Sequence, residues 1–271
     1  MSNLDGKVVW VTGSSRGIGA AIAKLFAQRG AKVAVHGRDQ KALAAVHAEI
    51  ERAGGHAIYV EADVTKFDQI EATRSQIERA LGPIDILVTS AGGSFTPPGP
   101  IEEISEDGWR ASVDSNLTTT FLTLKSVLSG MKHRRTGNVV TLSSFAGHVP
   151  HPRSPIPYAA AKAGIEILTK VVAAQAGPFG IRVNCIAPET ILTDRNLERI
   201  PDPLQKSLIE MHPIRRLGTP EDVARAALFL ASDESAWISG IVIDIAGGVA
   251  GYSFANATPP ASHVKNLLNE Y

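Results

Sequence analysis

Cysteine is almost absent from this sequence. The 271 residues contain one, Cys185, so no disulfide can form within the chain and burial of apolar surface must hold the fold together. Cys185 lies in the apolar run of residues 181–187, where we expect a buried, unreactive thiol rather than a nucleophile. The His, Cys and Asp residues show no metal-ligand spacing, so the sequence predicts no metal site.

An excess of charge of either sign is also missing. Lys plus Arg and Asp plus Glu both number 27, which gives a formal net charge of zero. This balance argues against a nucleic-acid-binding surface and removes one barrier to self-association. No run approaches the ~20 apolar residues of a membrane helix, and the first residues lack the basic and apolar regions of a signal peptide. We therefore expect a cytoplasmic protein that binds neither nucleic acid nor membrane.

What the sequence does contain is an alternation of short β-branched runs with longer helical patterns. The seven strand candidates are nearly continuous in apolar residues, as in strands buried on both faces. They are residues 7–12, 32–36, 56–61, 84–89, 138–143, 181–187 and 241–246. The helical patterns are residues 17–29, 40–52, 68–81, 107–132, 157–176 and 220–232. The alternation predicts an α/β fold over residues 1–250: a single doubly wound Rossmann domain, with a seven-stranded parallel sheet and helices on both faces.

Two stretches and a C-terminal tail interrupt this alternation. Residues 94–100 are rich in proline and cannot join a sheet ladder. Residues 190–212 form a long insertion after a strand, where ligand lids of α/β proteins commonly lie. Residues 251–271 follow the last strand candidate, and two interpretations of this tail stay open: a frayed terminus, or a segment that packs at a subunit interface.

A glycine-rich turn joins the first strand to the first helix. Residues 12–19 read TGSSRGIG. Glycines at such a junction let the backbone approach a pyrophosphate, whose charge the helix N-terminus stabilises. The same residues match the G-x-S-x-G elbow of hydrolases, with Ser15 as nucleophile, but that elbow normally follows later strands. The pattern predicts a dinucleotide site that includes Gly13, Ser15, Arg16, Gly17, Ile18 and Gly19.

The end of the second strand distinguishes between the two nicotinamide dinucleotides. An acidic residue at this place binds the ribose 2′-hydroxyl of NAD, whereas this sequence has Gly37 followed by Arg38. Together with Ser15 and Arg16, Arg38 predicts a positive pocket for the 2′-phosphate of NADP, and therefore NADPH as the cofactor. Two solvated surface arginines are the alternative interpretation.

With these motifs in order, the sequence resembles the short-chain dehydrogenase/reductase family from residue 6 to residue 248. Residues 215–240 are similar to the branch that contains 3-oxoacyl-acyl-carrier-protein reductases. Besides residues 12–19, the motifs that carry the resemblance are Ala62-Asp63-Val64, Ala91-Gly92, Asn116, Ser143-Ser144, Tyr158-x-x-x-Lys162 and Asn184…Pro188…Thr193.

The resemblance implies a set of cofactor contacts and an assembly. Subunits would associate as a homotetramer or homodimer through the helices that contain Asn116 and Tyr158. The implied cofactor contacts are Asp63 and Val64 on the adenine, Ala91 and Gly92 on its ribose, and Pro188, Ile191 and Thr193 on the nicotinamide carboxamide.

Three positions depart from the family pattern. Thr89-Ser90 replaces an Asn-Asn pair, Pro188-Glu189 replaces Pro-Gly, and residues 246–248 read Ala-Gly-Gly in place of Asp-Gly-Gly. None of the three removes a catalytic group. Glu189 does place a carboxylate at the nicotinamide end of the predicted cleft.

Tyr158 and Lys162 are four residues apart and therefore share one face of a helix. A carbonyl that accepts a hydride needs a proton donor. A phenol has an ordinary pKa of about 10, and a nearby ammonium lowers that pKa towards the working range. The pair predicts hydride transfer at a carbonyl or alcohol carbon, with Tyr158 as general acid/base and with Lys162 serving both the phenol and the nicotinamide ribose.

Two further residues complete the predicted catalytic group. Ser144 is expected to polarise the substrate oxygen, and Ser143 competes for this role. The resemblance implies that the backbone of Asn116 holds a water that contacts Lys162. The alternative for Asn116 is a helix-interior asparagine with a local hydrogen bond.

The sequence as a whole predicts an NADPH-dependent oxidoreductase that reduces a small-molecule carbonyl to an alcohol, or catalyses the reverse reaction. An NAD-dependent alcohol or sugar dehydrogenase and a non-catalytic NADPH-binding regulator stay open as alternatives. His148, His151 and Arg153 follow the serine pair, and we expect them near the substrate mouth, either as recognition groups or as solvated loop residues.

Overall fold

The computed structural model describes residues 3–150 and 154–249. The predicted tail, with the predicted domain boundary at residue 250, lies outside the described residues. So do His151 and Arg153.

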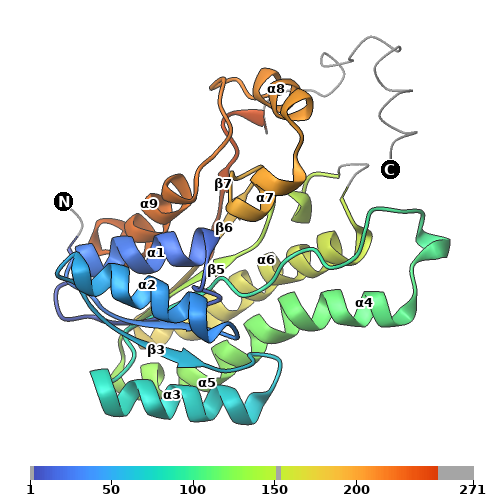
Figure 1. The fold of residues 1–271 in the computed structure, drawn as a ribbon. Helices are drawn as coiled ribbons and strands as arrows, with labels where there is room; N and C mark the ends of the chain where they lie inside the picture. The colour runs from blue at the N-terminus through green and yellow to red at the C-terminus, as the bar shows by residue number, and fades with distance from the viewer. Residues whose placement is uncertain (1–2, 151–153, 250–271) are drawn as a thin grey trace.

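One sheet of seven strands forms the centre of the molecule (Figure 1). All the pairings are parallel, and the strand order is β3-β2-β1-β4-β5-β6-β7, which confirms the predicted seven-stranded parallel sheet. The strands are β1 (Val8–Thr12), β2 (Lys32–Gly37), β3 (His56–Glu61), β4 (Ile86–Thr89), β5 (Gly137–Leu142), β6 (Ile181–Pro188) and β7 (Val242–Ile245).

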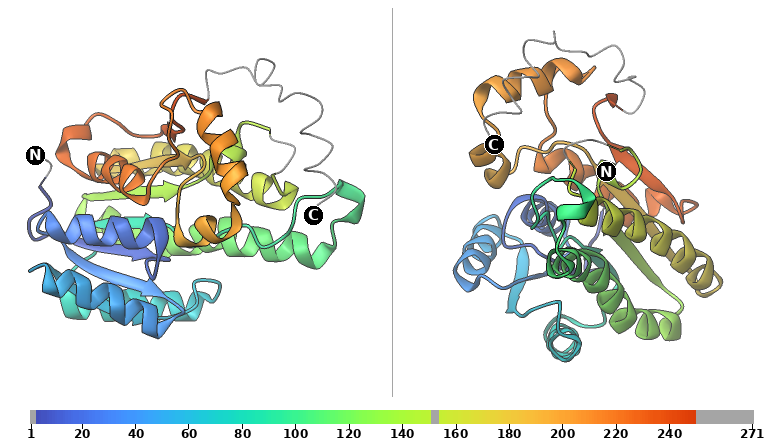
Figure 2. Two further views of the ribbon diagram at one scale, coloured as in Figure 1. Left: turned by 45° about the horizontal axis from the view of Figure 1, so that its top comes forward. Right: turned by 90° about the vertical axis from the view of Figure 1, so that its right-hand side faces the viewer.

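Helices cover both faces of this sheet (Figures 1 and 2). Helices α1, α2 and α9 contribute to one apolar core, and α3, α5 and α6 contribute to the other. The α-helices are α1 (Gly17–Gln28), α2 (Gln40–Arg52), α3 (Phe67–Leu81), α4 (Glu106–Val113), α5 (Thr119–Arg134), α6 (Ile156–Ala176), α7 (Asp194–Arg199), α8 (Asp202–Met211) and α9 (Pro220–Ala231). Short 3-10 turns are η1 (Ile101–Glu103), η3 (Phe145–Gly147), η4 (Gly177–Phe179) and η5 (Asp233–Ser235), and η2 (Asp114–Thr118) is a π-helical turn.

Burial on both sides explains why the strands have almost no polar alternation. All five residues of β1 are buried. Val9 and Val11 point into the core beneath α1 and α9, and Val8 and Trp10 point into the core beneath α3, α5 and α6. Successive side chains of a strand face opposite sides of the sheet, so a strand covered on both sides must be apolar at every position.

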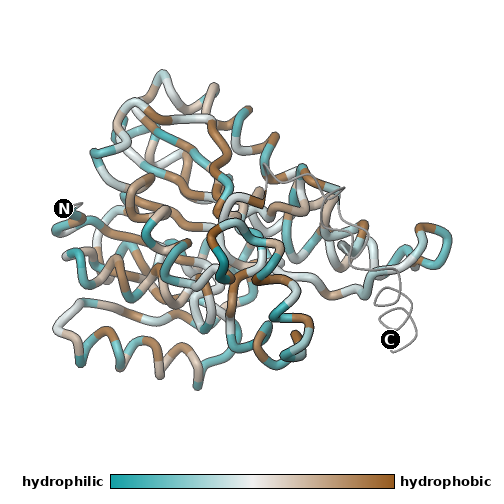
Figure 3. Tube along the Cα trace, turned by 90° about the horizontal axis from the view of Figure 1, so that it is seen from above, coloured by the Kyte–Doolittle hydropathy of each residue, from teal (hydrophilic) through white to brown (hydrophobic). Residues whose placement is uncertain are grey.

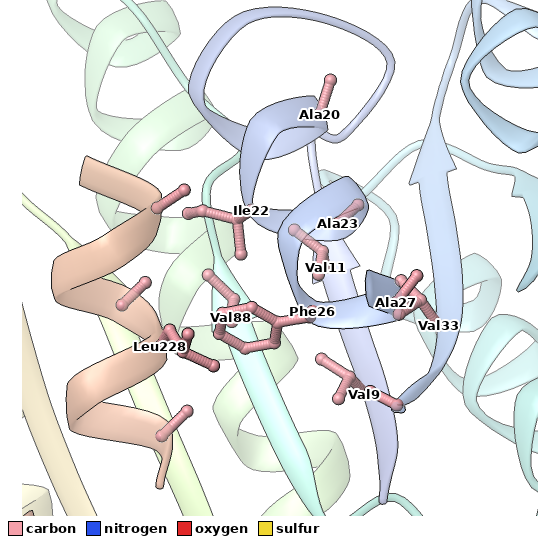
Figure 4. Packing of buried hydrophobic residues seen from close by; sticks show 14 of the residues in the cluster. Val9, Val11, Ala20, Ile22, Ala23, Phe26, Ala27, Val33, Val88 and Leu228 are labelled. Carbon is pink, nitrogen blue, oxygen red and sulfur yellow. The ribbon is translucent and has the colours of Figure 1, made fainter. Parts of the chain in front are cut away.

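The packing of α1 on α9 positions the glycine-rich turn at the start of α1. Figure 4 shows the ring of Phe26 of α1 beside Leu228 of α9 and Val88 of β4, and all three side chains are buried. Helix α9 begins at a capping box, in which the Thr219 hydroxyl accepts from the amide of Asp222 and the Asp222 carboxylate accepts from the amide of Thr219.

Hydropathy alternates along the outer helices (Figure 3), as one buried and one solvated face require.

The structure divides the helix that was predicted over residues 107–132. Helix α4 ends at Val113, the π-helical turn η2 follows, and α5 begins at Thr119, with helical backbone angles throughout. A π-turn inserts one extra residue into the helical spiral, which periodicity alone does not reveal. It places Asn116, which is fully buried, towards the loop after β4.

The predicted insertion at residues 190–212 contains the two short helices α7 and α8. They follow β6, and the right-hand view of Figure 2 shows α8, in orange, standing away from the sheet. Residues 94–100 belong to no strand, as predicted. No helix among residues 3–150 and 154–249 is long and apolar enough to cross a membrane.

Candidate active site

The glycine-rich turn packs directly against the chain that leaves β4. Gly13 has a φ of 65°, and a Cβ on Gly13 would lie 2.6 Å from the Cα of Ala91. A Cβ on Gly19 would lie 2.4 Å from the carbonyl oxygen of Gly13. Only glycine fits at both positions, so the turn brings Ala91 to the first turn of α1.

The N-terminus of α1 provides a place for an anion. Its N-cap residue, Arg16, makes no side-chain hydrogen bond to the first turn, and that turn contains no acidic residue. Amides of a first helical turn have no partner within the helix, and the helix dipole adds partial positive charge there. These free amides and this positive charge fit a pyrophosphate.

The two arginines of the predicted 2′-phosphate pocket are exposed and face carboxylates. Arg16 lies 2.9 Å from Asp39, and Arg38 lies 4.0 Å from Asp63. Asp39 also caps α2, because its other carboxylate oxygen accepts from the amide of Ala42 at 3.0 Å. Both arginines thus lie beside the end of β2, where Gly37 provides no carboxylate, but neither is preorganised by a buried partner.

Asp63 and Val64 follow β3 at the same edge of the sheet. A carboxylate oxygen of Asp63 accepts from the amide of Thr65 at 2.9 Å. Partial burial raises the pKa of Asp63, but the hydrogen bonds with Thr65 and the charge of Arg38 outweigh it and hold that pKa below its ordinary value. The carboxylate is therefore ionised and able to accept a further hydrogen bond.

Asn116 holds the loop after β4 in place. Its side-chain oxygen accepts from the amide of Gly93 at 3.0 Å, and its side-chain nitrogen donates to the carbonyls of Gly93 and Ser112 at 3.0 and 2.8 Å. The Asn116 carbonyl accepts from the hydroxyls of Thr119 and Thr120 at 3.0 and 2.8 Å. The local hydrogen bond considered for this residue is present, and it is joined by a long-range contact that links η2 to Gly93.

Tyr158 and Lys162 lie on α6 facing the end of β5. The Lys162 ammonium donates to the carbonyl of Leu142 at 3.0 Å and lies 5.5 Å from the centre of the Tyr158 ring. Burial lowers the pKa of Lys162 to about 8. Burial also raises the pKa of the Tyr158 phenol, opposite to the direction expected from a nearby ammonium, and a hydrogen bond with Ser144 and the charge of Arg195 offset only part of this rise.

The structure separates the two serines that follow β5. Ser143 is buried and its hydroxyl donates to Glu166 at 2.7 Å, beneath α6. Ser144 begins η3, accepts from the amide of Ala146 at 3.3 Å, and shares a hydrogen bond with Tyr158. The hydroxyl next to the phenol is therefore that of Ser144, and Ser143 is part of the packing between β5 and α6.

Sequence reasoning missed a charged network around His148. One ring nitrogen of His148 lies 2.9 Å from Glu166 on α6, and the other lies 3.0 Å from Asp244 on β7. Glu166 uses the same oxygen for Ser143 and for His148. Since carboxylates only accept hydrogen bonds when ionised, both ring nitrogens must carry hydrogen, which makes His148 a cation. The network fastens the Ser144 turn to α6 and β7.

The nicotinamide-side residues of the prediction lie between β6 and α7. Pro188 ends β6, Ile191 pairs with Gly218 in an isolated bridge, and Thr193 caps α7 by accepting from the amide of Asn196 at 3.3 Å. A Cβ on Gly17 would lie 3.2 Å from the Thr193 methyl group. The start of the inserted segment therefore approaches the glycine-rich turn.

Arg195 was not singled out from the sequence. It donates to the carbonyl of Ser94 at 2.9 Å, and its guanidinium lies 5.8 Å from the centre of the Phe95 ring. It thereby joins α7 to the proline-rich loop, with its charge close enough to lower the pKa of Tyr158. A single basic residue in a helical first turn has no distinctive sequence pattern, so only the fold reveals it.

All the predicted site residues thus lie at the carboxyl ends of the strands or on the segments that follow them. Ligands of doubly wound sheets bind at this edge, where the strand order reverses; here it reverses between β1 and β4. No group of metal-ligating side chains is found among the described residues.

The chain is similar to known proteins over most of its length. The sequence profile of a family described as Enoyl-(Acyl carrier protein) reductase matches residues 13–250. A 3-oxoacyl-acyl-carrier-protein reductase of Chlamydia muridarum is 38% identical over 250 residues, which cover 92% of this chain and 99% of the relative.

Two solved structures have the same fold. A short-chain dehydrogenase/reductase from Burkholderia xenovorans superimposes with a TM-score of 0.88 at 32% identity, covering 93% of this chain and 100% of the other. A 3-oxoacyl-acyl-carrier-protein reductase from Brucella melitensis, solved with bound NAD, has a TM-score of 0.83 at 35% identity and covers 90% of this chain and 91% of the other.

The His148 network makes a testable prediction about stability and pH. Burial lowers the pKa of His148, but hydrogen bonds with Glu166 and the charges of Glu166 and Asp244 raise it above the ordinary value. A raised histidine pKa stabilises the fold fully below the unfolded value of about 6.5, and this contribution is lost as the pH rises through the folded pKa. We expect His148→Gln to lower the free energy of unfolding most at about pH 6, and progressively less in alkaline buffer.

Urea unfolding of both proteins across this pH range measures the difference. His133→Gln, at an exposed histidine of α5, is the matched control and should leave the free energy of unfolding nearly unchanged. A His148→Gln effect of equal size at every pH would mean that the histidine contributes by packing rather than by charge.

Proposed function

Because this chain belongs to the short-chain dehydrogenase/reductase family, an oxidoreductase family acting on CH–OH and C=O groups, we propose that it is an NADPH-dependent enzyme that interconverts a carbonyl and an alcohol, with Tyr158 as general acid/base. One observation carries the proposal. The Tyr158 phenol, the Ser144 hydroxyl and the Lys162 ammonium lie together at the end of β5, on the same edge of the sheet as a helix N-terminus suited to a pyrophosphate. Family membership removes the hydrolase interpretation of Ser15.

The chain's own residues would hold the cofactor along the carboxyl edge of the sheet. In this proposal Asp63 and Val64 contact the adenine, Ala91 and Gly92 line its ribose, and the turn from Gly13 to Gly19 holds the pyrophosphate. The nicotinamide end is held by Pro188, Ile191 and Thr193. When bound, the cofactor supplies or accepts the hydride.

Proton transfer is the part of the reaction that the protein performs. Reduction of a carbonyl develops negative charge on its oxygen, which Ser144 stabilises by donating a hydrogen bond while Tyr158 delivers the proton. The raised pKa of the buried phenol keeps Tyr158 protonated, as the reduction direction requires. Lys162, with a pKa of about 8, is still largely protonated at neutral pH and stabilises the phenolate that remains.

Asn116 supports this group through Gly93. Its side chain holds the loop after β4 through two hydrogen bonds with Gly93, which keep Gly92 and Gly93 close to the proposed cofactor edge. A water on the Asn116 carbonyl, which would give Lys162 a proton route to solvent, has to share that oxygen with Thr119 and Thr120.

The first prediction of the proposal concerns the phenol. Tyr158→Phe removes one hydroxyl and keeps the ring, so we expect NADPH binding to survive and turnover to fall by roughly 10²–10⁴-fold, the usual contribution of a general acid. Lys162→Ala should weaken both NADPH binding and turnover, because the ammonium serves the ribose and the phenol. NADPH fluorescence titration is measured beside steady-state reduction of ketones, aldehydes and 3-oxoacyl thioesters.

Ser143→Ala is the matched control for Ser144→Ala, since the two serines are adjacent but only Ser144 contacts Tyr158. Turnover should fall for Ser144→Ala far more than for Ser143→Ala. Near-normal turnover of a Tyr158→Phe enzyme that still binds NADPH would remove Tyr158 from its role as proton donor.

The second prediction concerns the choice of cofactor. Arg38→Asp should shift the ratio of NADPH to NADH affinity towards NADH, because an aspartate accepts from a 2′-hydroxyl and repels a 2′-phosphate. Arg110→Asp, at an exposed arginine of α4, controls for the change in net charge. If the wild type already binds NADH as tightly as NADPH, the prediction of a positive 2′-phosphate pocket is wrong.

The third prediction concerns assembly. We propose that subunits associate as a homodimer or homotetramer through α5 and α6, where Ile167 and Val171, one turn apart on α6, are 59% and 48% exposed and Phe121 of α5 is 47% exposed. Exposed apolar side chains grouped on one face are typical of protein interfaces. Ile167→Glu with Val171→Glu should lower the particle mass measured by light scattering.

Lys41→Glu on α2 is the control for added charge, and it should leave the mass unchanged. Deletion of residues 251–271 tests whether the tail packs at the same interface. A wild type that is already monomeric would exclude the proposed assembly.

A further inference from the structure

Glu189 occupies a place where the family pattern has glycine, and the structure shows what its carboxylate contacts. The residue follows β6 directly, and its amide donates to Ile245 of β7 at 3.1 Å. One carboxylate oxygen lies 2.7 Å from a ring nitrogen of His212, and the other accepts from the Thr190 hydroxyl at 2.9 Å. The Thr190 amide also donates to this carboxylate.

His212 lies at the end of α8 and is 3% exposed. Its second ring nitrogen donates to the carbonyl of Leu208 at 2.6 Å. An acceptor therefore faces each ring nitrogen, so both must carry hydrogen and the ring is a cation. The pKa values agree: Glu189 raises the pKa of His212, and the hydrogen bonds with His212 and Thr190 outweigh burial and lower the pKa of Glu189.

This ion pair lies where three segments of chain meet. The end of β6 contributes Glu189, the end of α8 contributes His212, and a Cβ on Gly247, just after β7, would lie 3.2 Å from the His212 ring. Backbone hydrogen bonds continue the junction, because Gly218 donates to Thr190 at 3.1 Å and Leu192 donates to Gly218 at 2.8 Å. The inserted segment is thus fastened at both of its ends beside Glu189.

His212 is buried and Glu189 is partly buried, with 22% of its side chain exposed. Taking away one member of such an ion pair leaves the other charge without its partner where water has little access, so the surrounding chain must move to solvate it. Here the chain that would move is the segment of residues 188–193. A glycine at position 189 has no side chain to reach α8, so this constraint belongs to the present sequence and not to the family pattern.

The proposed function assigns the nicotinamide carboxamide to Pro188, Ile191 and Thr193, all within four residues of Glu189. Resting on that assignment, we propose that Glu189 and His212 are positioning residues that set the affinity for the nicotinamide half of the cofactor by holding the inserted segment onto the end of β6. Glu189 does not meet a cationic substrate in this role, because both of its oxygens are bonded to His212 and Thr190.

The test compares two ligands on the full-length protein by isothermal titration calorimetry. NADPH contains the nicotinamide, and 2′-phospho-ADP-ribose has the same adenosine half without it. We expect Glu189→Gln and His212→Gln each to weaken NADPH binding on the order of tenfold, within the range of coupling between charged residues in contact. Binding of 2′-phospho-ADP-ribose should stay within about twofold, and the double variant should lose little more than either single one.

Glu106→Gln is the matched control, because it removes a carboxylate from an exposed ion pair with Arg110 on α4. Thermal unfolding identifies variants that have lost the fold. If Glu189→Gln is among them, Glu189→Gly, which restores the family residue, takes its place. Unchanged NADPH affinity in both single variants, or an equal loss for both ligands, overturns the inference.

The proposed function fails in a different way. If the wild type binds NADPH and the Glu189 and His212 variants lose affinity for NADPH but not for 2′-phospho-ADP-ribose, the positioning role is supported even if Tyr158→Phe remains active. A wild type that binds 2′-phospho-ADP-ribose as tightly as NADPH shows no nicotinamide contribution to be positioned, and overturns the inference directly.

Discussion

All seven strands of the sheet point the same way, and every part of the candidate site depends on this constraint. Parallel strands bring all their carboxyl ends to one edge, and helical crossovers return the chain to the opposite edge each time. Residues that are far apart in the sequence, such as Gly13 after β1 and Ser144 after β5, therefore meet at the same edge. The reversal of strand order between β1 and β4 separates the segments that follow them and leaves space there for a ligand.

The charged side chains at the two ends of this edge differ in exposure and in how they are paired. At the proposed adenosine end the arginines are exposed and their ion pairs are open to solvent, so they contribute little to stability. At the proposed nicotinamide end Lys162 and His212 are buried, and each charged group is paired or hydrogen-bonded: Lys162 with Leu142, the partly exposed His148 with two carboxylates, and His212 with Glu189. A charge with little access to water depends more on its protein partner than an exposed one does.

The two histidine networks act on different segments. His148 fastens the Ser144 turn to α6 and β7, and His212 fastens the inserted segment to the end of β6. In both, the two ring nitrogens face acceptors, and each ring joins elements that are far apart in the sequence. The π-turn at Asn116 performs a similar task without charge, because its amide side chain bonds both backbone groups of Gly93.

The sequence by itself determined the number of strands and their alternation with helices along the chain. It also determined that helices cover both faces, and it supplied the glycine-rich turn and the Tyr158–Lys162 pair of the candidate site. These features are local: apolar periodicity, glycine spacing and a four-residue helical interval each depend on neighbours in the chain. Helix ends were accurate to a residue or two, and only the π-turn at Asn116 lay hidden within a predicted helix.

Only the tertiary structure decided which serine faces the phenol, which carboxylates surround His148, and what Glu189 contacts. The sequence favoured Ser144 but left Ser143 as a competitor, and the two differ in the structure because α6 packs against Ser143. Glu189 and His212 are 23 residues apart, with α7 and α8 between them, so no local pattern pairs them. Their contact depends on how the inserted segment folds back onto the end of β6, which the packing of the whole domain determines.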